Sequence, residues 1–245
     1  MTTLSSFDPF ATHPFTNNSG LVHRPAKPAQ YTHHVAPPAH KAYGAPAPRF
    51  AGEAAIERVF DIFAVFISNT SKTVALWNQR LAASPGDVVV WDYHVVLLLR
   101  IKAKHLDAYN QPLRGQSAAW IYDFDSVVDS PSPWQRYVSL TFGAPGEIAP
   151  PYQSSFRVVP ADMLFAQFVS DRSHMLVPLD SIRYSPERPH YSPLPPWPAI
   201  RGAGARADVA TNLMSTFVNM GDTGMGEVHD RAAFEQWCSG PDAPK

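Results

Sequence analysis

A nearly continuous apolar run from Val88 to Ile101 constrains the fold of this chain more than any other feature. Such a run is typical of a strand buried on both faces of a sheet. Asp92 and His94 interrupt it, and because strand side chains alternate, we expect these two to share one face. Burying polar groups costs free energy unless they are hydrogen-bonded. The pair therefore indicates either a structural His–Asp pair at a strand end or a rigidly held functional site.

The remaining pattern predicts a single α+β domain with a mostly antiparallel sheet flanked by helices. We expect a short helix over residues 53–60, with its apolar spacing continuing to Phe63, then a strand over 63–69 whose hairpin partner is 72–77. Further strands are predicted at 118–124 and 156–159, and helices at 131–137 and 161–168. Short closing elements are predicted at 213–220 and 232–237, and the proline-dense segment 178–198 is expected to lie extended over the surface.

Composition divides the chain into three parts. Residues 1–51 are rich in Pro, Ala and His and lack an apolar period, so we expect a disordered tail. Its His residues are irregularly spaced and no carboxylate or Cys cluster joins them, which argues against a metal site. Residues 52–238 are the predicted domain, and residues 239–245 are a C-terminal tail.

Charge and cysteine content narrow the possible partners and compartment. The formal net charge is −1, which gives no footprint for nucleic acid or an anionic membrane, and no apolar run is long enough to span a bilayer. The first residues resemble no secretion signal. One cysteine, Cys238, excludes an intramolecular disulfide and fits a reducing compartment. We expect a cytoplasmic protein, possibly also nuclear.

Two further stretches carry polar side chains that could form a site. Asp123 and Asp125 are two residues apart on the strand predicted to pair with the first, so either could orient one ring nitrogen of His94 and leave the other as a general base. Spacing alone leaves Asp92, Asp123 and Asp125 all open, and each could instead be a turn or surface carboxylate. Asp171 and Arg172 lie in a polar cluster that could bind a charged substrate group or only cap a helix and pair with each other.

Together these stretches resemble the protein N-terminal glutamine amidohydrolase family. The resemblance covers roughly residues 52–237 and rests on five strings in the family's order, together with 212–226. They are Ala64-Val65-Phe66-Ile67-Ser68-Asn69, Trp91-Asp92-Tyr93-His94-Val95-Val96-Leu97-Leu98, Ile121-Tyr122-Asp123-Phe124-Asp125, Phe156-Arg157-Val158 and Ser170-Asp171-Arg172-Ser173-His174-Met175.

The resemblance implies a monomer with a core like the transglutaminases and papain-like cysteine hydrolases. It implies deamidation of N-terminal Gln in proteins or peptides to Glu with release of ammonia, a step that feeds the N-degron pathway, with no cofactor and no metal. By matching position, His94 is the catalytic base and Asp123 is the carboxylate that orients it. Asp171 and Arg172 are candidates for substrate contact.

The family's nucleophile, the Cys of a Tyr-Cys-Glu-Glu-Asn string that opens a helix, has no counterpart in this sequence. Gln30-Tyr31-Thr32-His33 resembles the lead-in to that string, but the Pro/Ala-rich residues that follow contain no Cys. Cys238 lies near the carboxyl end and is expected to be a structural or free thiol. Ser68 could be proposed as a replacement hydroxyl, although a serine in such a turn more often bonds to backbone.

Three interpretations follow from the missing cysteine. The sequence could come from a gene model or splice form that lost the cysteine helix of an active enzyme, which is the explanation we favour because the abnormal region is one contiguous block. It could instead be a catalytically dead family member that binds N-terminal Gln peptides. Independently of the family, it could be a His–Asp hydrolase that uses a serine.

Overall fold

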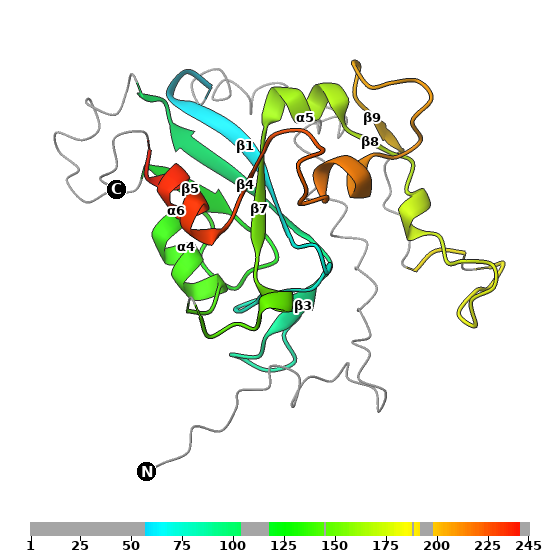
Figure 1. Ribbon diagram of the computed structural model, residues 1–245, viewed down its shortest axis with the longest axis horizontal. Helices are drawn as coiled ribbons and strands as arrows, with labels where there is room; N and C mark the ends of the chain where they lie inside the picture. The colour runs from blue at the N-terminus through cyan, green and yellow to red at the C-terminus, as the bar shows by residue number, and fades with distance from the viewer. Residues whose placement is uncertain (1–56, 104–117, 145, 188, 192–197, 241–245) are drawn as a thin grey trace, which may run out of the picture.

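A computed structural model describes residues 57–103, 118–144, 146–187, 189–191 and 198–240 (Figure 1). Its centre is a six-stranded antiparallel sheet with the strand order β10-β7-β1-β4-β5-β6. These strands are β1 (Phe60–Ser68), β4 (His94–Ile101), β5 (Ala119–Tyr122), β6 (Ser132–Pro133), β7 (Ser155–Pro160) and β10 (Glu227–His229). The predicted α+β class with a mostly antiparallel sheet is confirmed.

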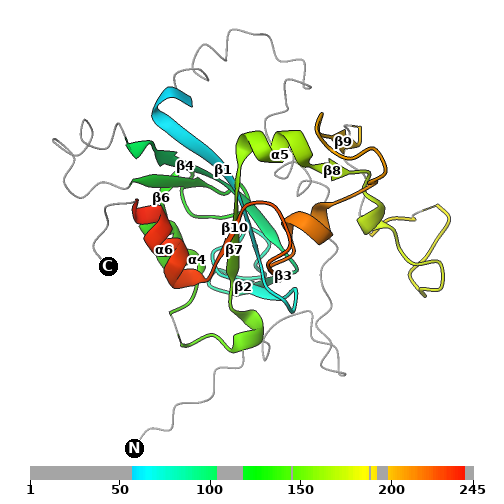
Figure 2. The same cartoon turned by 45° about the horizontal axis from the view of Figure 1, so that its top comes forward.

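Helices cover both faces of this sheet, as the turned view shows (Figure 2). On one face lie α4 (Trp134–Thr141) and α6 (Arg231–Ser239), and on the other lie α5 (Ala161–Gln167) and the π-helical turn η5 (Leu213–Phe217). The predicted helices after Pro131 and Pro160 and both closing elements are therefore confirmed. Among the described residues, no helix has both the length and the apolar character needed to cross a membrane.

Strand β1 shows why the central strands are apolar throughout. Its alternate residues Phe63, Val65 and Ile67 belong to the core under α4 and α6. The residues between them, Ala64 and Phe66, belong to the second core under α5 and η5. A strand between two helical layers must bury both of its faces, so it loses the usual alternation of apolar and polar residues.

The structure corrects three predictions about where strands begin and which strands pair. Residues 57–59 are helical, but β1 already begins at Phe60, so the helical spacing read through Phe63 is wrong; residues 53–56 lie outside the described ranges. The segment β2 (Val74–Leu76) pairs with β3 (Val89–Trp91) and not with β1. The run 88–101 is two strands, because the chain bends at Asp92 and Tyr93 between β3 and β4.

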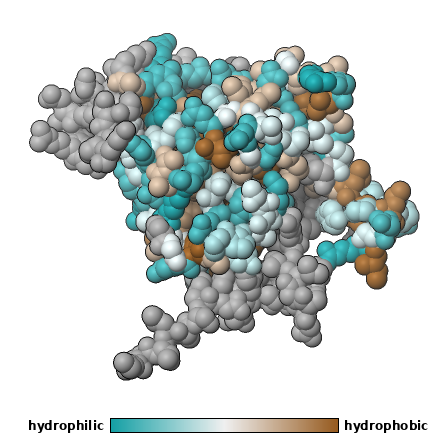
Figure 3. Space-filling view, viewed as in Figure 1, coloured by the Kyte–Doolittle hydropathy of each residue, from teal (hydrophilic) through white to brown (hydrophobic). Residues whose placement is uncertain are grey.

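The segment after α5 forms a projecting loop. It contains β8 (Val169–Ser170), paired with β9 (Ile200–Arg201), and the single turn η4 (Ser173–Met175). Another single turn, η3 (Pro150–Tyr152), lies outside this loop, before β7. In its described part, the proline-dense stretch folds back on residues 175–177, with Val177 N–H donating to the Pro189 carbonyl at 2.8 Å and Tyr191 N–H to the Met175 carbonyl at 2.9 Å. This loop is the yellow segment of Figure 1 and carries apolar residues outward in Figure 3. Within residues 178–191 the chain thus folds back and does not follow the expected extended path, while residues 188 and 192–197 lie outside the described ranges.

Candidate active site

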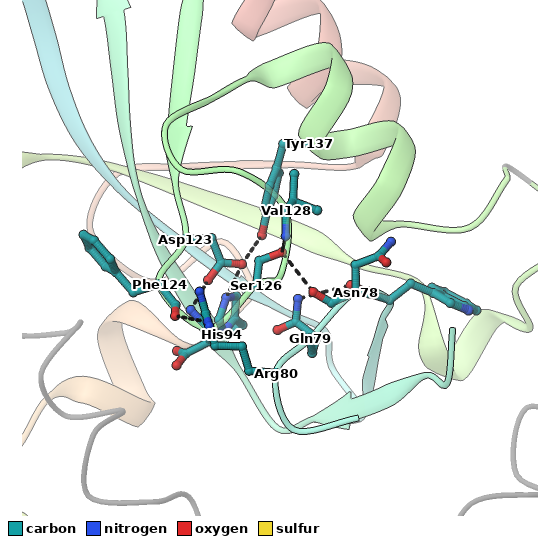
Figure 4. Close-up of polar contacts among 11 residues, drawn as sticks. Asn78, Gln79, Arg80, His94, Asp123, Phe124, Ser126, Val128 and Tyr137 are labelled. Carbon is teal, nitrogen blue, oxygen red and sulfur yellow. Dashed lines mark hydrogen bonds and ion pairs between the residues drawn. The ribbon is translucent and has the colours of Figure 1, made fainter. Parts of the chain in front are cut away.

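The imidazole of His94 and the carboxylate of Asp123 meet at one end of the sheet (Figure 4). His94 opens β4, and Asp123 follows the last residue of β5. Because β4 and β5 are antiparallel neighbours, the start of one lies beside the end of the other. His94 Nε2 is 3.0 Å from Asp123 Oδ2, and both side chains are almost fully buried.

The geometry distinguishes the two ring nitrogens of His94. The contact between Nε2 and Oδ2 is short, but the N–H direction lies outside the geometry of a regular hydrogen bond. An ionised carboxylate is an acceptor only, and it therefore favours a proton on the nitrogen that faces it. This arrangement leaves Nδ1 as the nitrogen that can accept a proton from a reacting group.

Two further donors hold the Asp123 carboxylate. The Tyr137 hydroxyl donates to Oδ2 at 2.8 Å, and the backbone N–H of Asp125 donates to Oδ1 at 2.9 Å. Burial by itself raises the pKa of Asp123, but the charge and contact of His94 together with these two donors outweigh it and hold the pKa below its ordinary value. Asp123 is thus kept ionised in a buried place.

Asp125 completes a buried group of three ionisable side chains. One ligand atom each from His94, Asp123 and Asp125 lie within 4.8 Å of one another. Carboxylate oxygens and imidazole nitrogens are common ligands of divalent metal ions. However, Asp123 Oδ2 already faces the Tyr137 hydroxyl and His94, so its electron pairs are directed at these donors and fit an orienting role better than metal ligation.

A turn at residues 78–80 fixes the backbone that follows Asp123. The Arg80 N–H donates to the Asp125 carbonyl at 2.7 Å, and the Arg80 Nε donates to the Phe124 carbonyl at 3.1 Å. The Asn78 carbonyl accepts from the Val127 N–H at 2.8 Å and from the Ser126 hydroxyl at 3.0 Å. Asn78 has φ +55°, a left-handed conformation that Asn tolerates better than most residues. These contacts fix the backbone of residues 124–127, directly after Asp123, including Asp125, whose N–H donates to the Asp123 carboxylate.

Sequence reasoning did not identify Tyr137 or this turn as parts of the site. Tyr137 lies on the apolar face of α4, where it reads as an ordinary core aromatic. A signal existed, because a buried tyrosine usually finds a partner for its hydroxyl, and the candidate carboxylate Asp123 lies 14 residues earlier in the sequence. The role of the turn at 78–80 was less evident from the sequence, because its hydrogen-bond partners lie about 45 residues further along the chain.

Asp92 and Ser68 serve the local backbone. The prediction that Asp92 and His94 share a face assumed an unbroken strand, and the bend between β3 and β4 removes that basis. Asp92 Oδ1 accepts the N–H of Tyr93 at 2.9 Å. The Ser68 hydroxyl is buried and donates to the Asp92 carbonyl at 2.6 Å, which ties the end of β1 to the bend.

Cys238 is part of the hydrophobic core. It is fully buried on α6 beside Phe234, and burial raises the pKa of its thiol far above the usual range. Its neighbour Trp237 accepts a hydrogen bond from Arg100 at 3.4 Å through its carbonyl. Arg100 is six residues from His94 on β4, a separation of about 20 Å along a strand. The thiol therefore lies near the opposite end of β4 from His94.

Asp171 and Arg172 lie together between β8 and η4. Asp171 Oδ1 accepts the N–H of Ser173, the first residue of η4, at 2.9 Å. Arg172 has φ +70°, and its guanidinium donates to the Pro198 carbonyl at 2.9 Å. Neither the predicted helix cap nor contact with a substrate is tested by these contacts, so both stay predictions.

A hollow of about 510 Å³ opens at the same end of the sheet. Its lining includes Asn69 and Ser155, which lie at the ends of β1 and β7, and Asp230 and Arg231 at the start of α6. Phe142 forms another wall and packs edge-on against Tyr137, with ring centroids 6.0 Å apart. His94 and Asp123 are not part of this lining, so the hollow is next to the site but separate from it.

Comparison with known proteins identifies the family of this chain. Residues 48–238 match the family model described as N-terminal glutamine amidase. The human protein N-terminal glutamine amidohydrolase is 34% identical over 176 residues, which cover 71% of this chain and 72% of that protein. The Arabidopsis thaliana protein of the same name is 37% identical over 134 residues, covering 55% of each, and the Bos taurus protein is 41% identical over 116 residues, covering 47% and 49%. The chain thus spans about half the length of these last two relatives.

The family match extends over well more than half of the 245 residues and contains both His94 and Asp123. The chain therefore belongs to the N-terminal glutamine amidase family.

Proposed function

We propose that this protein is a hydrolase that deamidates the side chain of N-terminal glutamine in proteins and peptides, giving N-terminal glutamate and ammonia. The observation that carries the proposal is the buried contact between His94 Nε2 and Asp123 Oδ2 inside a chain of this family. The resemblance also leads us to propose a single domain over residues 52–238 of the transglutaminase and papain-like type. We propose that it acts as a cytoplasmic or nuclear monomer, without a cofactor, in the N-degron pathway.

The chemistry requires an activated nucleophile, because a primary amide is a poor electrophile. In the family mechanism a thiol gives its proton to the base, and the thiolate attacks the amide carbon to form a tetrahedral oxyanion. His94 Nδ1 is placed to take that proton and to return it to the leaving nitrogen, which departs as ammonia. Water then attacks the thioester, with His94 accepting its proton, and the bond to sulfur breaks to release glutamate and the thiol.

Asp123 contributes through the imidazole. Its ionised carboxylate keeps the Nε2 proton in place while Nδ1 is unprotonated, and it stabilises the imidazolium that forms when Nδ1 accepts a proton. The Asp125 N–H and the turn at 78–80 hold that carboxylate in one orientation. Asp171 and Arg172 remain proposed contacts for the substrate.

The thiol itself is the missing part of this mechanism. The sequence contains one cysteine, and Cys238 is buried in the core with a raised pKa, near the far end of β4. The family's Tyr-Cys-Glu-Glu-Asn string is absent from the sequence, and the residues resembling its lead-in lie outside the described ranges. A gene model or splice form that lost the cysteine helix explains an intact base beside an absent nucleophile.

The alternative is a catalytically dead family member that binds N-terminal Gln peptides. The absence of the cysteine string is the observation that favours it. Such a protein would retain the ordered end of the sheet, because the contacts among His94, Asp123 and Tyr137 do not depend on a nucleophile.

Ammonia release from a Gln-initiated peptide by the purified chain tests the proposal, with an Asn-initiated peptide and a His94→Ala variant as controls. Gln-specific release that is lost in the variant supports the enzyme, and loss after iodoacetamide would separate a thiol from a serine nucleophile. Binding of the Gln peptide without release supports the alternative. If a transcript is found that encodes the cysteine helix and its product also fails to release ammonia or bind the peptide, the proposal is refuted.

A further inference from the structure

A tyrosine on α4 reaches into the His–Asp pair from outside the strands that carry it. The Tyr137 hydroxyl is 2.8 Å from Asp123 Oδ2, which is the same oxygen that faces His94 Nε2 (Figure 4). The tyrosine is 1% exposed, and its ring packs edge-on against Phe142. Filling the core would require only the ring, so the direction of the hydroxyl is a separate fact that needs an explanation.

The donors around Asp123 show what this hydroxyl does. The Asp125 N–H occupies Oδ1, and that donor is fixed because it belongs to the backbone. Burial and the charge of Asp123 raise the pKa of Tyr137 well above its ordinary value, so its hydroxyl keeps its proton. A protonated hydroxyl beside an ionised carboxylate donates to it. Oδ2 is therefore held between two groups, one from α4 and one from β4.

We propose that Tyr137 is a positioning residue that acts through Asp123: its hydroxyl holds the carboxylate ionised and aligned so that His94 keeps its proton on Nε2 and presents Nδ1 as the base. The inference rests on the proposed function for its catalytic meaning, but its physical content concerns the protonation of two side chains. It can therefore be tested in this chain whether or not the chain turns over a substrate.

The location of Tyr137 makes this role specific. It sits within α4, next to Val138 in the core, and Phe142 beyond the helix packs edge-on against Phe156 of β7, with centroids 5.2 Å apart. The hydroxyl is thus carried by a helix that is anchored to the sheet. Any movement of α4 away from the sheet would release Asp123 Oδ2.

The test compares Tyr137→Phe with Tyr93→Phe by NMR of the whole chain, using labelled Asp carboxyl carbons and His ring nitrogens. Tyr93 is a matched control because it is also buried, at 4% exposed, but it belongs to the core on the other face of the sheet. In Tyr137→Phe, the titration midpoint of Asp123 should move to higher pH by on the order of one pH unit, since a hydrogen bond to a charged group is lost. In Tyr93→Phe it should not move.

The nitrogen spectra supply a second measurement, which can be made first on the unaltered chain and then on Tyr137→Phe. In the unaltered chain, at a pH where the imidazole of His94 is neutral, Nε2 should show the chemical shift of a protonated ring nitrogen and Nδ1 that of an unprotonated one. In Tyr137→Phe, the preference for the tautomer with its proton on Nε2 should be weaker than in the unaltered chain. A proton on Nδ1 in the unaltered chain, or an Asp123 midpoint that moves equally in both variants, would overturn the proposal. Failure of ammonia release would leave these measurements unaffected and would count against the proposed function only.

Discussion

Replacing Asp123 with asparagine tests the electrostatic design of the site most directly. The side chain keeps its size, but one carboxylate oxygen becomes an NH₂ donor. At the Oδ1 position it would face the fixed N–H of Asp125, so the NH₂ group should take the Oδ2 position. There it meets the Tyr137 hydroxyl, which must turn from donor to acceptor, and His94 Nε2, which can accept from the NH₂ group only as an unprotonated nitrogen.

The expected loss of stability follows from the three groups that contact the Asp123 charge, which are His94 Nε2, the Tyr137 hydroxyl and the Asp125 N–H. A net hydrogen bond to a charged group contributes about 1 kcal/mol more than a neutral one. Three partners of Asp123 therefore give a loss of about 2–3 kcal/mol at neutral pH, allowing for incomplete additivity. For a domain of this size, a loss of that amount lowers Tm by roughly 4–12 °C.

The effect should depend on pH with a definite sign. The folded-state pKa of Asp123 is lowered, so its contribution to stability is fully present above the unfolded pKa of about 4 and is lost as pH falls through the folded pKa. Urea unfolding of the original chain and of Asp123→Asn, at pH 7 and then at decreasing pH, measures the difference between their free energies of unfolding. This difference should become smaller below about pH 4. Asp129→Asn is the control, because that carboxylate is 88% exposed and lies 3.6 Å from Arg136. A difference that stays constant with pH, or an equal loss in the control, would refute the reasoning.

Two further predictions concern buried groups outside the site. Arg157 is 1% exposed and donates to the carbonyls of Asn219 and Gly221 at 2.8 Å and of Met225 at 3.2 Å. Arg157→Met should therefore lower the free energy of unfolding by about 3–5 kcal/mol and speed amide exchange across residues 219–225. An equal effect from the exposed Arg136→Met would contradict this. Cys238 is buried with a raised pKa, so iodoacetamide should label it at least about a hundredfold more slowly in the native chain than in urea, measured by mass spectrometry. Rapid native labelling would show that the thiol is accessible and reopen it as a nucleophile.

The apolar pattern was sufficient to predict the layers of this protein. Strands with no polar face, such as β1 and β4, require cover on both sides, and the helices after Pro131 and Pro160 supply part of it. The pattern was insufficient for pairing. A short apolar segment such as β2 shows that it needs a neighbour, but not which one, because the choice of β3 over β1 depends on the path of the intervening turn.

The continuous apolar run illustrates the same limit at the site. Hydropathy does not record the bend at Asp92 and Tyr93, since both β3 and β4 are buried and their residues are similarly apolar. The bend removed the basis for the expectation that Asp92 and His94 share one face, because that expectation assumed an unbroken strand. It is also the point that makes His94 the first residue of β4, next to the end of β5.

The sequence alone determined the two-sided sheet, the family resemblance, the candidates His94 and Asp123, and the absence of the family's cysteine string. These depend on residue identity and on local periodicity, which a linear chain displays directly. The tertiary structure decided that Asp123 is the carboxylate that faces His94 and that it faces Nε2. It also decided that Tyr137 contacts this carboxylate and that the turn at 78–80 holds the backbone after it. It also placed Cys238 in the core. Such properties arise when groups far apart along the chain approach within hydrogen-bond distance, and burial then makes each of those contacts strong enough to matter.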